Sequence, residues 1–393
     1  MNTKRLSILI CLILLVQLCG CVLPEDQRFV NPTAPVDWHP TEPKETVPPP
    51  ETLAPAPPSV KTAEDVVDDL SLPQQVAQLF LVKCPAGGAA ELLAEYHVGG
   101  IVLYGQDTAG ETPDSLRAEL RGYQSQVPVR LIVAVDEEGG TVNRISSRRA
   151  FRDEPFPSPH EVYMGGGISA LRKSEAEKAL FLKNLGVNVN LAPVCDVVTE
   201  DDAFMADRSL RLTEIETAEA VAAMVEAMQA NGVGAVLKHF PGYGNLIGDT
   251  HTGKVVDGRS KAMLQAYDFL PFQKGINAGV GAVMVSHSIV NAIDSSWPAT
   301  LSAEVHRVLR DELGFQGVII TDDLAMGAIT ELYDPGEAAV QAILAGNDLL
   351  LTNWSEGQYQ AILDAVAEGR ISADVIRRSC IRIVQWKMDL GLL

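Results

Sequence analysis

The sequence predicts an α/β protein built as a single (β/α)8 barrel, also called a TIM barrel. Short apolar runs rich in β-branched residues recur along the chain, and segments with helical spacing lie between them. Such runs are typical of parallel strands covered by helices on both faces. Eight strand–helix units fit a barrel. The expected strands are 79–82, 100–104, 131–135, 187–192, 234–237, 282–285, 318–321 and 348–351.

The expected helices support the same architecture. Four of them stop within two residues of a glycine, which is a common helix-ending residue. An open doubly wound sheet is the alternative, but its G-x-G-x-x-G fingerprint is absent after the first strand. The glycine-rich run 164–167 follows no expected strand, so we expect a loop there. The clearest expected helices are 213–231, 302–313, 337–344, 358–368 and 371–388.

Composition limits the possible partners. The chain has 393 residues, 47% of them hydrophobic, and a formal net charge of -20. This charge argues against nucleic acid as a partner and against electrostatic binding to an acidic membrane surface. Three widely spaced cysteines, Cys84, Cys195 and Cys380, form neither a disulfide framework nor a metal site, so we expect buried free thiols. We expect a monomer.

The N-terminal segment has the features of a bacterial lipoprotein signal. Residues 1–20 combine a basic start with an apolar stretch that is too short to span a bilayer comfortably. The run Leu18-Cys19-Gly20-Cys21 resembles a lipobox, which predicts lipidation of Cys21 and an extracytoplasmic protein anchored to the cell membrane. An ordinary signal peptide or an uncleaved anchor is the alternative.

A proline-rich segment follows the signal. Ten prolines fall between Asn31 and Val60, and such a segment favours extended polyproline II conformations. We interpret residues 21–61 as a tether and residues 62–393 as the barrel domain. A ligand for an SH3-type domain is the less favoured interpretation of the prolines.

Polar residues gather where the expected strands end. In a barrel, the active site is built at the C-terminal ends of the strands, so residues far apart in the sequence are expected to meet there. A short loop after the fifth strand adds a further acid and a histidine, Asp249 and His251. The strand-end candidates are Asp136, Arg144, Asn190, Asp196, Arg208, Lys238, His239, His287, Asp322 and Asp323.

These residue types favour glycosyl transfer over other hydrolytic chemistry. The chain has no G-x-S-x-G nucleophile elbow, and no H-x-H or H-E-x-x-H pattern, so a serine hydrolase or a metal hydrolase is disfavoured and no metal or cofactor is expected. A carboxylate that attacks an anomeric carbon and a protonated group that assists the leaving oxygen would suffice. We assign these roles to Asp322 and His251, with Asp249 orienting the imidazole.

Six short segments together resemble the family 3 glycoside hydrolases, and specifically the bacterial β-N-acetylglucosaminidases that trim cell-wall muropeptides. The most specific are the K-H-F-P-G segment and the D-[ST]-H segment that follows it. The six are 136–144, 190–196, 208–209, 238–242, 249–251 and 320–326.

The resemblance implies a retaining exo-acting β-N-acetylglucosaminidase with a carbohydrate substrate. It implies Asp322 as nucleophile, His251 as acid/base and Asp249 as its partner. A β-glycosidase of other specificity, a phosphorylase and an inactive binding lipoprotein remain alternatives. The residues expected to bind the sugar in the -1 subsite are Asp136, Arg144, Arg208, Lys238 and His239.

The chain departs from the family pattern at three places: Thr141 replaces a common arginine, Thr252-Gly253-Lys254 replaces a Leu-Pro pattern after His251, and one loop differs. The family commonly has G-H-G-D after the proline, whereas this chain has Gly242-Tyr243-Gly244-Asn245. Because the loop is rich in glycine, we expect it to be mobile and to bring His251 to the site when substrate is bound.

Overall fold

The computed structural model describes residues 61–393, and the predicted signal peptide, Cys21 and the proline-rich segment up to residue 60 lie outside the described residues. Eight parallel strands run side by side in the order β11-β9-β7-β6-β3-β2-β1-β12. A parallel bridge between Ile320 and Leu349 joins the two outer strands. The predicted (β/α)8 barrel is confirmed. The strands are β1 (Phe80–Lys83), β2 (Gly100–Leu103), β3 (Ile132–Val135), β6 (Val189–Asn190), β7 (Gly234–Phe240), β9 (Ala282–Val285), β11 (Val318–Thr321) and β12 (Leu350–Thr352).

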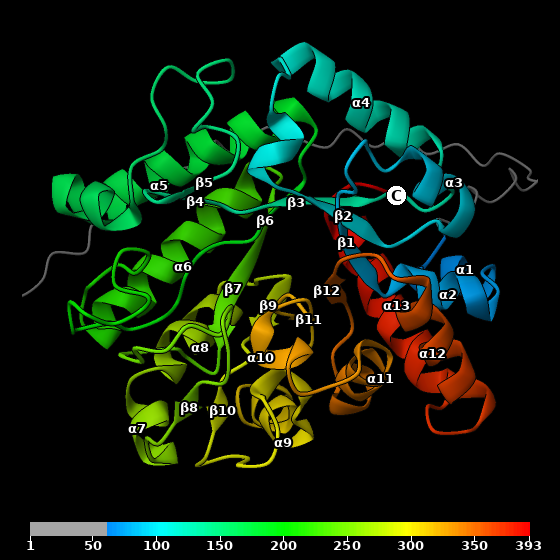
Figure 1. Cartoon of the computed structure of the whole chain (residues 1–393). Coiled ribbons are helices and arrows are strands. Elements are labelled where there is room, and N and C mark those ends of the chain that lie inside the picture. Colours follow the sequence, from blue (N-terminus) through cyan, green and yellow to red (C-terminus); the bar gives the residue numbers. More distant parts are fainter. Residues whose placement is uncertain (1–60) are drawn as a thin grey trace, which may run out of the picture. The chain divides into compact units, whose positions relative to one another are not determined.

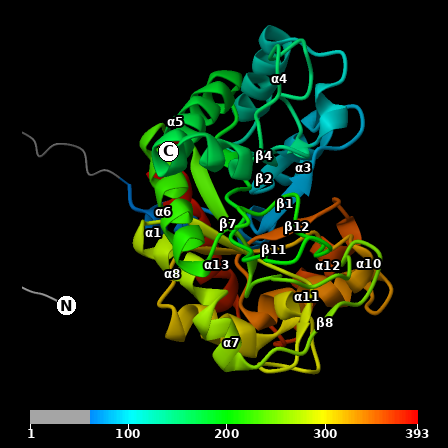
Figure 2. The ribbon, with the colours of Figure 1, turned by 90° about the vertical axis from the view of Figure 1, so that its left-hand side faces the viewer.

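Helices surround the strands on the outside (Figure 1). Figure 2 shows the ring from the side, with α5, α6 and α8 next to one another. The helices are α1 (Ala63–Asp68), α2 (Leu72–Gln78), α3 (Ala90–Tyr96), α4 (Pro113–Ser125), α5 (Pro159–Leu185), α6 (Glu214–Ala230), α7 (Lys261–Ala266), α8 (Phe269–Asn277), α9 (Ala303–Arg307), α10 (Gly327–Thr330), α11 (Pro335–Ala345), α12 (Glu356–Ala367) and α13 (Ala373–Asp389). Short 3-10 or π-helical segments are η1 (Gly105–Thr108), η2 (Ala299–Leu301) and η3 (Val308–Glu312).

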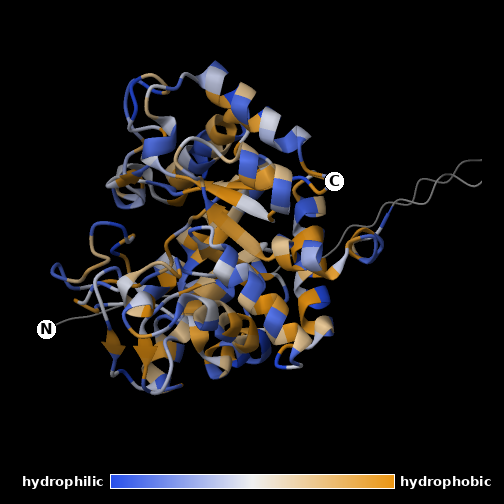
Figure 3. Ribbon diagram, turned by 45° about the vertical axis from the view of Figure 1, so that its right-hand side comes forward, coloured by the Kyte–Doolittle hydropathy of each residue, from blue (hydrophilic) through white to orange (hydrophobic). Residues whose placement is uncertain are grey.

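The strands form the hydrophobic centre of the barrel. Every residue of β2, β3, β9 and β11 is buried, and Figure 3 shows the central strands as hydrophobic while the helices mix both kinds of residue. Strands that are covered on both faces need this continuous apolar pattern. The eight apolar runs were therefore sufficient to locate every strand of the barrel.

Local sequence also fixes where helices begin and end. Thr213 caps α6 by accepting a hydrogen bond from the backbone N–H of Glu216, while the Glu216 carboxylate accepts from the backbone N–H of Thr213. This reciprocal capping box satisfies two backbone donors that a helix start otherwise leaves open. Gly186 ends α5 with φ of 94°, a left-handed conformation that glycine adopts readily.

Three details differ from the sequence predictions. The run 164–167 is predicted to be a loop, but it lies inside α5, where Gly166 and Gly167 have non-helical dihedrals and kink the helix. Strand β7 continues beyond Leu237 to Phe240. The helix expected over 302–313 begins as α9 and continues as the π-helical η3. Glycine pairs are a recognised cause of helix kinks.

Two small sheets lie outside the barrel. The hairpin of β4 (Glu137–Gly139) and β5 (Val142–Asn143) follows β3 directly, and β8 (Val256–Asp257) pairs with β10 (Ile289–Val290). The three cysteines of the barrel are free and buried, as predicted. Among the helices of residues 61–393, none is both long and apolar enough to cross a membrane.

Candidate active site

A pocket of about 380 Å³ lies at the C-terminal ends of the barrel strands. Its lining side chains come from positions between Lys83 and Leu351, so residues far apart in the sequence meet there, as expected for a barrel site. Seven of the eight residues predicted for catalysis or sugar binding line it, and the eighth, Asp249, is bonded to His251. The pocket is lined by Lys83, Tyr104, Asp136, Val142, Arg144, Leu191, Arg208, Lys238, His239, His251, Met284, Asp322, Asp323, Met326 and Leu351.

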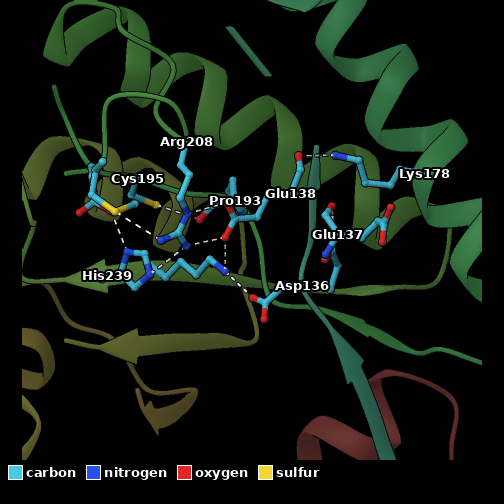
Figure 4. Close-up of polar contacts among 12 residues, drawn as sticks. Asp136, Glu137, Glu138, Lys178, Pro193, Cys195, Arg208 and His239 are labelled. Carbon is cyan, nitrogen blue, oxygen red and sulfur yellow. Dashed lines mark hydrogen bonds and ion pairs between the residues drawn. The ribbon is translucent and has the colours of Figure 1, made fainter. Parts of the chain in front are cut away.

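Four charged residues form what we call the ion cluster: Asp136, Glu138, Arg208 and Lys238 (Figure 4). Lys238 Nζ lies 2.6 Å from both Asp136 Oδ1 and Glu138 Oε1. Arg208 donates two hydrogen bonds to Glu138, from Nε at 2.9 Å and from Nη2 at 2.6 Å. The side chains of Lys238 and Glu138 are each only 2% exposed.

The ion cluster compensates buried charge with opposite charge. Burial alone would raise the pKa of Glu138 and lower that of Lys238. The Arg208 and Lys238 cations instead hold the pKa of Glu138 well below its ordinary value. Asp136 and Glu138 likewise hold the pKa of Lys238 above its ordinary value. Glu138, Arg208 and Lys238 therefore keep their charges. Asp136, Arg208 and Lys238 line the pocket.

His239 is held next to the ion cluster by Asp196. Its Nδ1 lies 2.8 Å from Asp196 Oδ2, and Arg208 Nη2 lies 3.4 Å from its Nε2. The strand register shifts between Leu237 and Phe240, and this irregularity lets the neighbouring side chains of Lys238 and His239 both line the pocket. A regular strand would send them to opposite faces.

Arg144 is positioned through its backbone by a buried acid to which the sequence pattern gave no role. The Glu137 carboxylate accepts hydrogen bonds from the backbone N–H groups of Arg144, Ile145 and Ser146 at 2.8–3.1 Å. The Arg144 guanidinium lies 5.6 Å from the centre of the Tyr104 ring, a distance at which a cation is attracted to an aromatic face.

Asp322 follows β11 directly and is half-buried in the pocket. Its backbone N–H donates to Val285 O at 2.9 Å, and its Oδ1 accepts from the N–H of Asp323 at 2.8 Å. Burial raises the pKa of Asp322, but the imidazoles of His287 and His239 and the Asp323 N–H more than offset this effect. The pKa therefore lies below its ordinary value, and the carboxylate is ionised at neutral pH.

The neighbouring Asp323 is engaged differently. Its carboxylate forms an ion pair with Lys83, a pocket residue at the end of β1 that no sequence motif singled out. Its backbone carbonyl accepts a hydrogen bond from His287 Nε2 at 2.9 Å. Burial lowers the pKa of His287, so this imidazole loses its proton more readily than an exposed histidine. The Asp323 carboxylate is thus engaged in an ion pair, whereas the Asp322 carboxylate faces the pocket without an ion-pair partner among the described residues.

Asp249 and His251 form a hydrogen-bonded dyad on the loop that follows β7. The Asp249 carboxylate lies 2.7 Å from His251 Nδ1 and accepts from the His251 backbone N–H at 2.8 Å. Gly327 and Ala328, just beyond Asp322, donate their backbone N–H groups to the carbonyls of His251 and Thr250, each at 3.1 Å. The dyad loop, residues 242–251, is therefore fastened to the segment that carries Asp322.

The dyad is far more exposed than the ion cluster. The side chains of His251 and Asp249 are 58% and 33% exposed. His251 nevertheless lines the pocket in the structure. The predicted movement of the loop on substrate binding stays a prediction, and the described conformation is one in which His251 is already at the pocket. No group of three or more possible metal ligands occurs among residues 61–393.

A (β/α)8 barrel whose pocket combines an ionised carboxylate with a histidine acid/base candidate fits the class of glycoside hydrolases. The chain belongs to glycosyl hydrolase family 3. Residues 71–386 match the family described as "Glycosyl hydrolase family 3 N terminal domain", so the resemblance predicted from six short segments is confirmed.

Named relatives agree with this family. Beta-hexosaminidase LpqI of Mycobacterium tuberculosis is 31% identical over 331 residues, which cover 81% of this chain and 83% of the relative. Beta-hexosaminidase A of Pseudoalteromonas piscicida is 30% identical, but the match covers only 55% of its length and 77% of this chain. The family 3 β-N-acetylglucosaminidase of Paenibacillus sp. FPU-7 superposes with a TM-score of 0.77 at 31% identity, covering 82% of this chain and 63% of that structure.

Proposed function

We propose that this chain is a retaining exo-β-N-acetylglucosaminidase that releases terminal β-linked N-acetylglucosamine from peptidoglycan fragments. The observation that carries the proposal is the ionised Asp322 in the same pocket as the Asp249–His251 dyad. A nucleophilic carboxylate and a separate proton donor are the two groups that a retaining glycosidase needs. The choice of N-acetylglucosamine as the sugar is supported by the name of the Paenibacillus relative, a β-N-acetylglucosaminidase.

In the first step, Asp322 attacks the anomeric carbon and forms a covalent glycosyl–enzyme ester. The bond between the anomeric carbon and the leaving oxygen breaks, and His251 transfers its Nε2 proton to that oxygen. His251 Nδ1 is bonded to Asp249, and the Asp249 carboxylate stabilises the imidazolium before the transfer.

In the second step, a water molecule attacks the same carbon. The neutral His251 takes the proton of this water, and the bond to Asp322 breaks, which restores both groups. Two inversions give net retention of the anomeric configuration. Asp136, Lys238, Arg208, His239 and Arg144 bind the sugar in the -1 subsite, where their charged groups contact its hydroxyls and N-acetyl group.

We also propose that lipidated Cys21 anchors the enzyme outside the cell membrane and that residues 22–61 act as a spacer. The sequence pattern alone supports this proposal, because Cys21 and residues 22–60 lie outside the described residues. Cell fractionation tests it: the Cys21→Ala variant is expected in the culture medium, and its retention in the membrane would count against lipidation.

A screen of aryl β-glycosides with the purified chain tests the activity. We expect turnover of the β-N-acetylglucosaminide well above that of the β-glucoside and β-xyloside, and release of free N-acetylglucosamine from peptidoglycan digests. Proton NMR should show the β-anomer as the first product. A sugar 1-phosphate formed in phosphate buffer would instead establish a phosphorylase, and an α-anomer would exclude the retaining mechanism.

A further inference from the structure

Tyr243 stands where the chain departs from the family pattern, and it lies inside the dyad loop. Its side chain is buried, with 3% exposure. It packs in a small apolar cluster that is separate from the main core. The buried members of that cluster are Val194, Val198, Ala203, Met205, Ala206 and Tyr243. A tyrosine buried this deeply usually has a partner for its hydroxyl.

The Tyr243 hydroxyl contacts the backbone on both sides of Asp249. It donates a hydrogen bond to Gly248 O at 2.7 Å and accepts one from the Thr250 N–H at 3.2 Å. Thr250 is 2% exposed, so its N–H would lose its acceptor in a buried setting if the hydroxyl were absent. An unsatisfied buried donor is costly, and the loop would shift to regain a partner.

The backbone of Tyr243 is tied to the sugar-binding side of the pocket. Its N–H donates to Asp196 Oδ1 at 2.6 Å, and Asp196 Oδ2 bonds His239. The ring of Phe204 lies 5.6 Å from the Tyr243 ring and 6.2 Å from the His251 ring, measured between centroids. Tyr243 therefore connects the residue that holds His239 with the backbone that carries the dyad.

We propose that Tyr243 is a positioning residue for the acid/base dyad, which it holds at the pocket by bonding the backbone on both sides of Asp249. The proposal rests on the acid/base role of His251 given above. Tyr243 does not itself touch the reacting atoms. It acts through the placement of His251, so removing its hydroxyl should impair only the proton transfers in which His251 takes part.

The Tyr243→Phe variant of the full chain tests the proposal with two β-N-acetylglucosaminides that differ in leaving group. With an alkyl or sugar leaving group, which must be protonated, we expect kcat/KM, which reports the first step, to fall about tenfold, less than the whole contribution of a general acid. With nitrophenol, which departs unprotonated, kcat/KM should stay nearly unchanged. Equal losses with both leaving groups, or no loss with either, would overturn the proposal.

A double-variant comparison separates this proposal from the role of His251. Adding Tyr243→Phe to His251→Ala should cause no further loss with the poor leaving group, because both act through one proton donor. A further tenfold loss would show that Tyr243 acts elsewhere and would overturn the proposal. If His251→Ala alone shows no leaving-group dependence, the acid/base assignment itself fails, and the positioning role fails with it.

Tyr359→Phe is the matched control. Its hydroxyl donates to Pro73 O at 3.2 Å, and it is absent from the pocket lining, so its loss should leave both rates unchanged. Hydrogen exchange supplies a readout independent of activity. Peptides covering residues 246–252 should exchange faster in Tyr243→Phe and not in Tyr359→Phe, and unchanged exchange in that segment would overturn the proposal.

Discussion

On one side of the pocket, the charged groups at the ends of β3 and β7 are buried and paired, whereas the acid/base dyad stands on a loop that is open to solvent. Lys238 and Glu138 are each 2% exposed, and the His251 side chain is 58% exposed. The ion cluster depends on low exposure, because charge–charge attraction is strong only where water is excluded.

This difference suits the two tasks that we propose for the two sides. Sugar binding needs fixed partners in a fixed geometry, and the rigid strand ends of the barrel supply it. Proton transfer needs a group that exchanges protons with solvent between turnovers, and a loop residue can do so. Asp322 is intermediate in exposure: it is half-buried, and it lines the pocket together with residues of both sides.

The largest loss of activity is expected on substitution of Asp322, which lines the same pocket as the ion cluster and His251. Asp322→Asn replaces the ionised carboxylate by an amide that cannot form the glycosyl ester. We expect kcat/KM on an aryl β-N-acetylglucosaminide to fall on the order of 10⁴-fold, as for the loss of a residue that acts as part of a catalytic unit. Asp311→Asn, at an exposed position on η3, is the control. Turnover equal in both variants would remove the nucleophile assignment.

A selective effect is expected on the exposed side. His251→Ala removes the proton donor, so we expect kcat to fall about 10²–10⁴-fold for a poor leaving group, the usual range for general acid catalysis. The first step with nitrophenol should be affected far less. Lys254→Ala, an exposed residue just beyond the dyad, should behave like the unaltered chain. Similar losses for both leaving groups would mean that His251 binds substrate and does not protonate it.

Substitution in the buried ion cluster should lower the unfolding free energy of the protein. Glu138→Gln leaves Arg208 without its charge partner and Lys238 with Asp136 alone. Breaking a buried pair in this way costs roughly 3–5 kcal/mol of unfolding free energy. Glu226→Gln breaks a pair with Arg172 in which both side chains are 48% exposed, and should cost about 0–1 kcal/mol. Urea unfolding measures both, and equal losses would contradict the contrast between the two sides.

The sequence was sufficient to locate the barrel and most of the pocket, for a physical reason. Buried parallel strands need continuous apolar runs, and a barrel brings the polar residues at their C-terminal ends together. Asp136, Lys238, His239 and Asp322 can therefore be grouped from their positions at the strand ends alone.

Other parts depend on pairings that no local pattern encodes. Glu138 binds Arg208, 70 positions along the chain, and Lys83 pairs with Asp323 across the barrel closure. The tyrosine of the dyad loop is visible in the sequence as a departure from the family, but its role depends on the direction of its hydroxyl. The loop predicted at the glycine run is limited to Gly166 and Gly167, because their neighbours sustain the helix α5 on both sides of the kink.

A second buried lysine, Lys387, can be compared with Lys238 of the ion cluster. Its substitution is expected to have the smallest of the predicted effects, a change in how stability depends on pH. Lys387 in α13 is as buried as Lys238, but its Nζ bonds a neutral amide, Gln78 Oε1, at 2.7 Å. Burial lowers the pKa of Lys387 to about 7 from an ordinary value of 10.5, whereas the carboxylates around Lys238 raise its pKa. At pH values between these two pKa values, Lys387 is protonated in the unfolded chain but neutral in the folded chain. Lys387 therefore makes the unfolding free energy rise with pH, by at most about 1.4 kcal/mol per pH unit.

Lys387→Met removes this titration while keeping a long unbranched side chain. We therefore expect the unfolding free energy of the variant, measured in urea from neutral pH upward, to rise less steeply with pH than that of the unaltered chain. Lys173→Met, at an exposed position on α5, should leave the slope unchanged. The absolute stability of Lys387→Met also reflects the acceptor that it leaves unpaired on Gln78, so the slope is the decisive quantity. An unchanged slope would mean that Lys387 stays charged when buried, and that a neutral amide can replace the carboxylates that Lys238 requires.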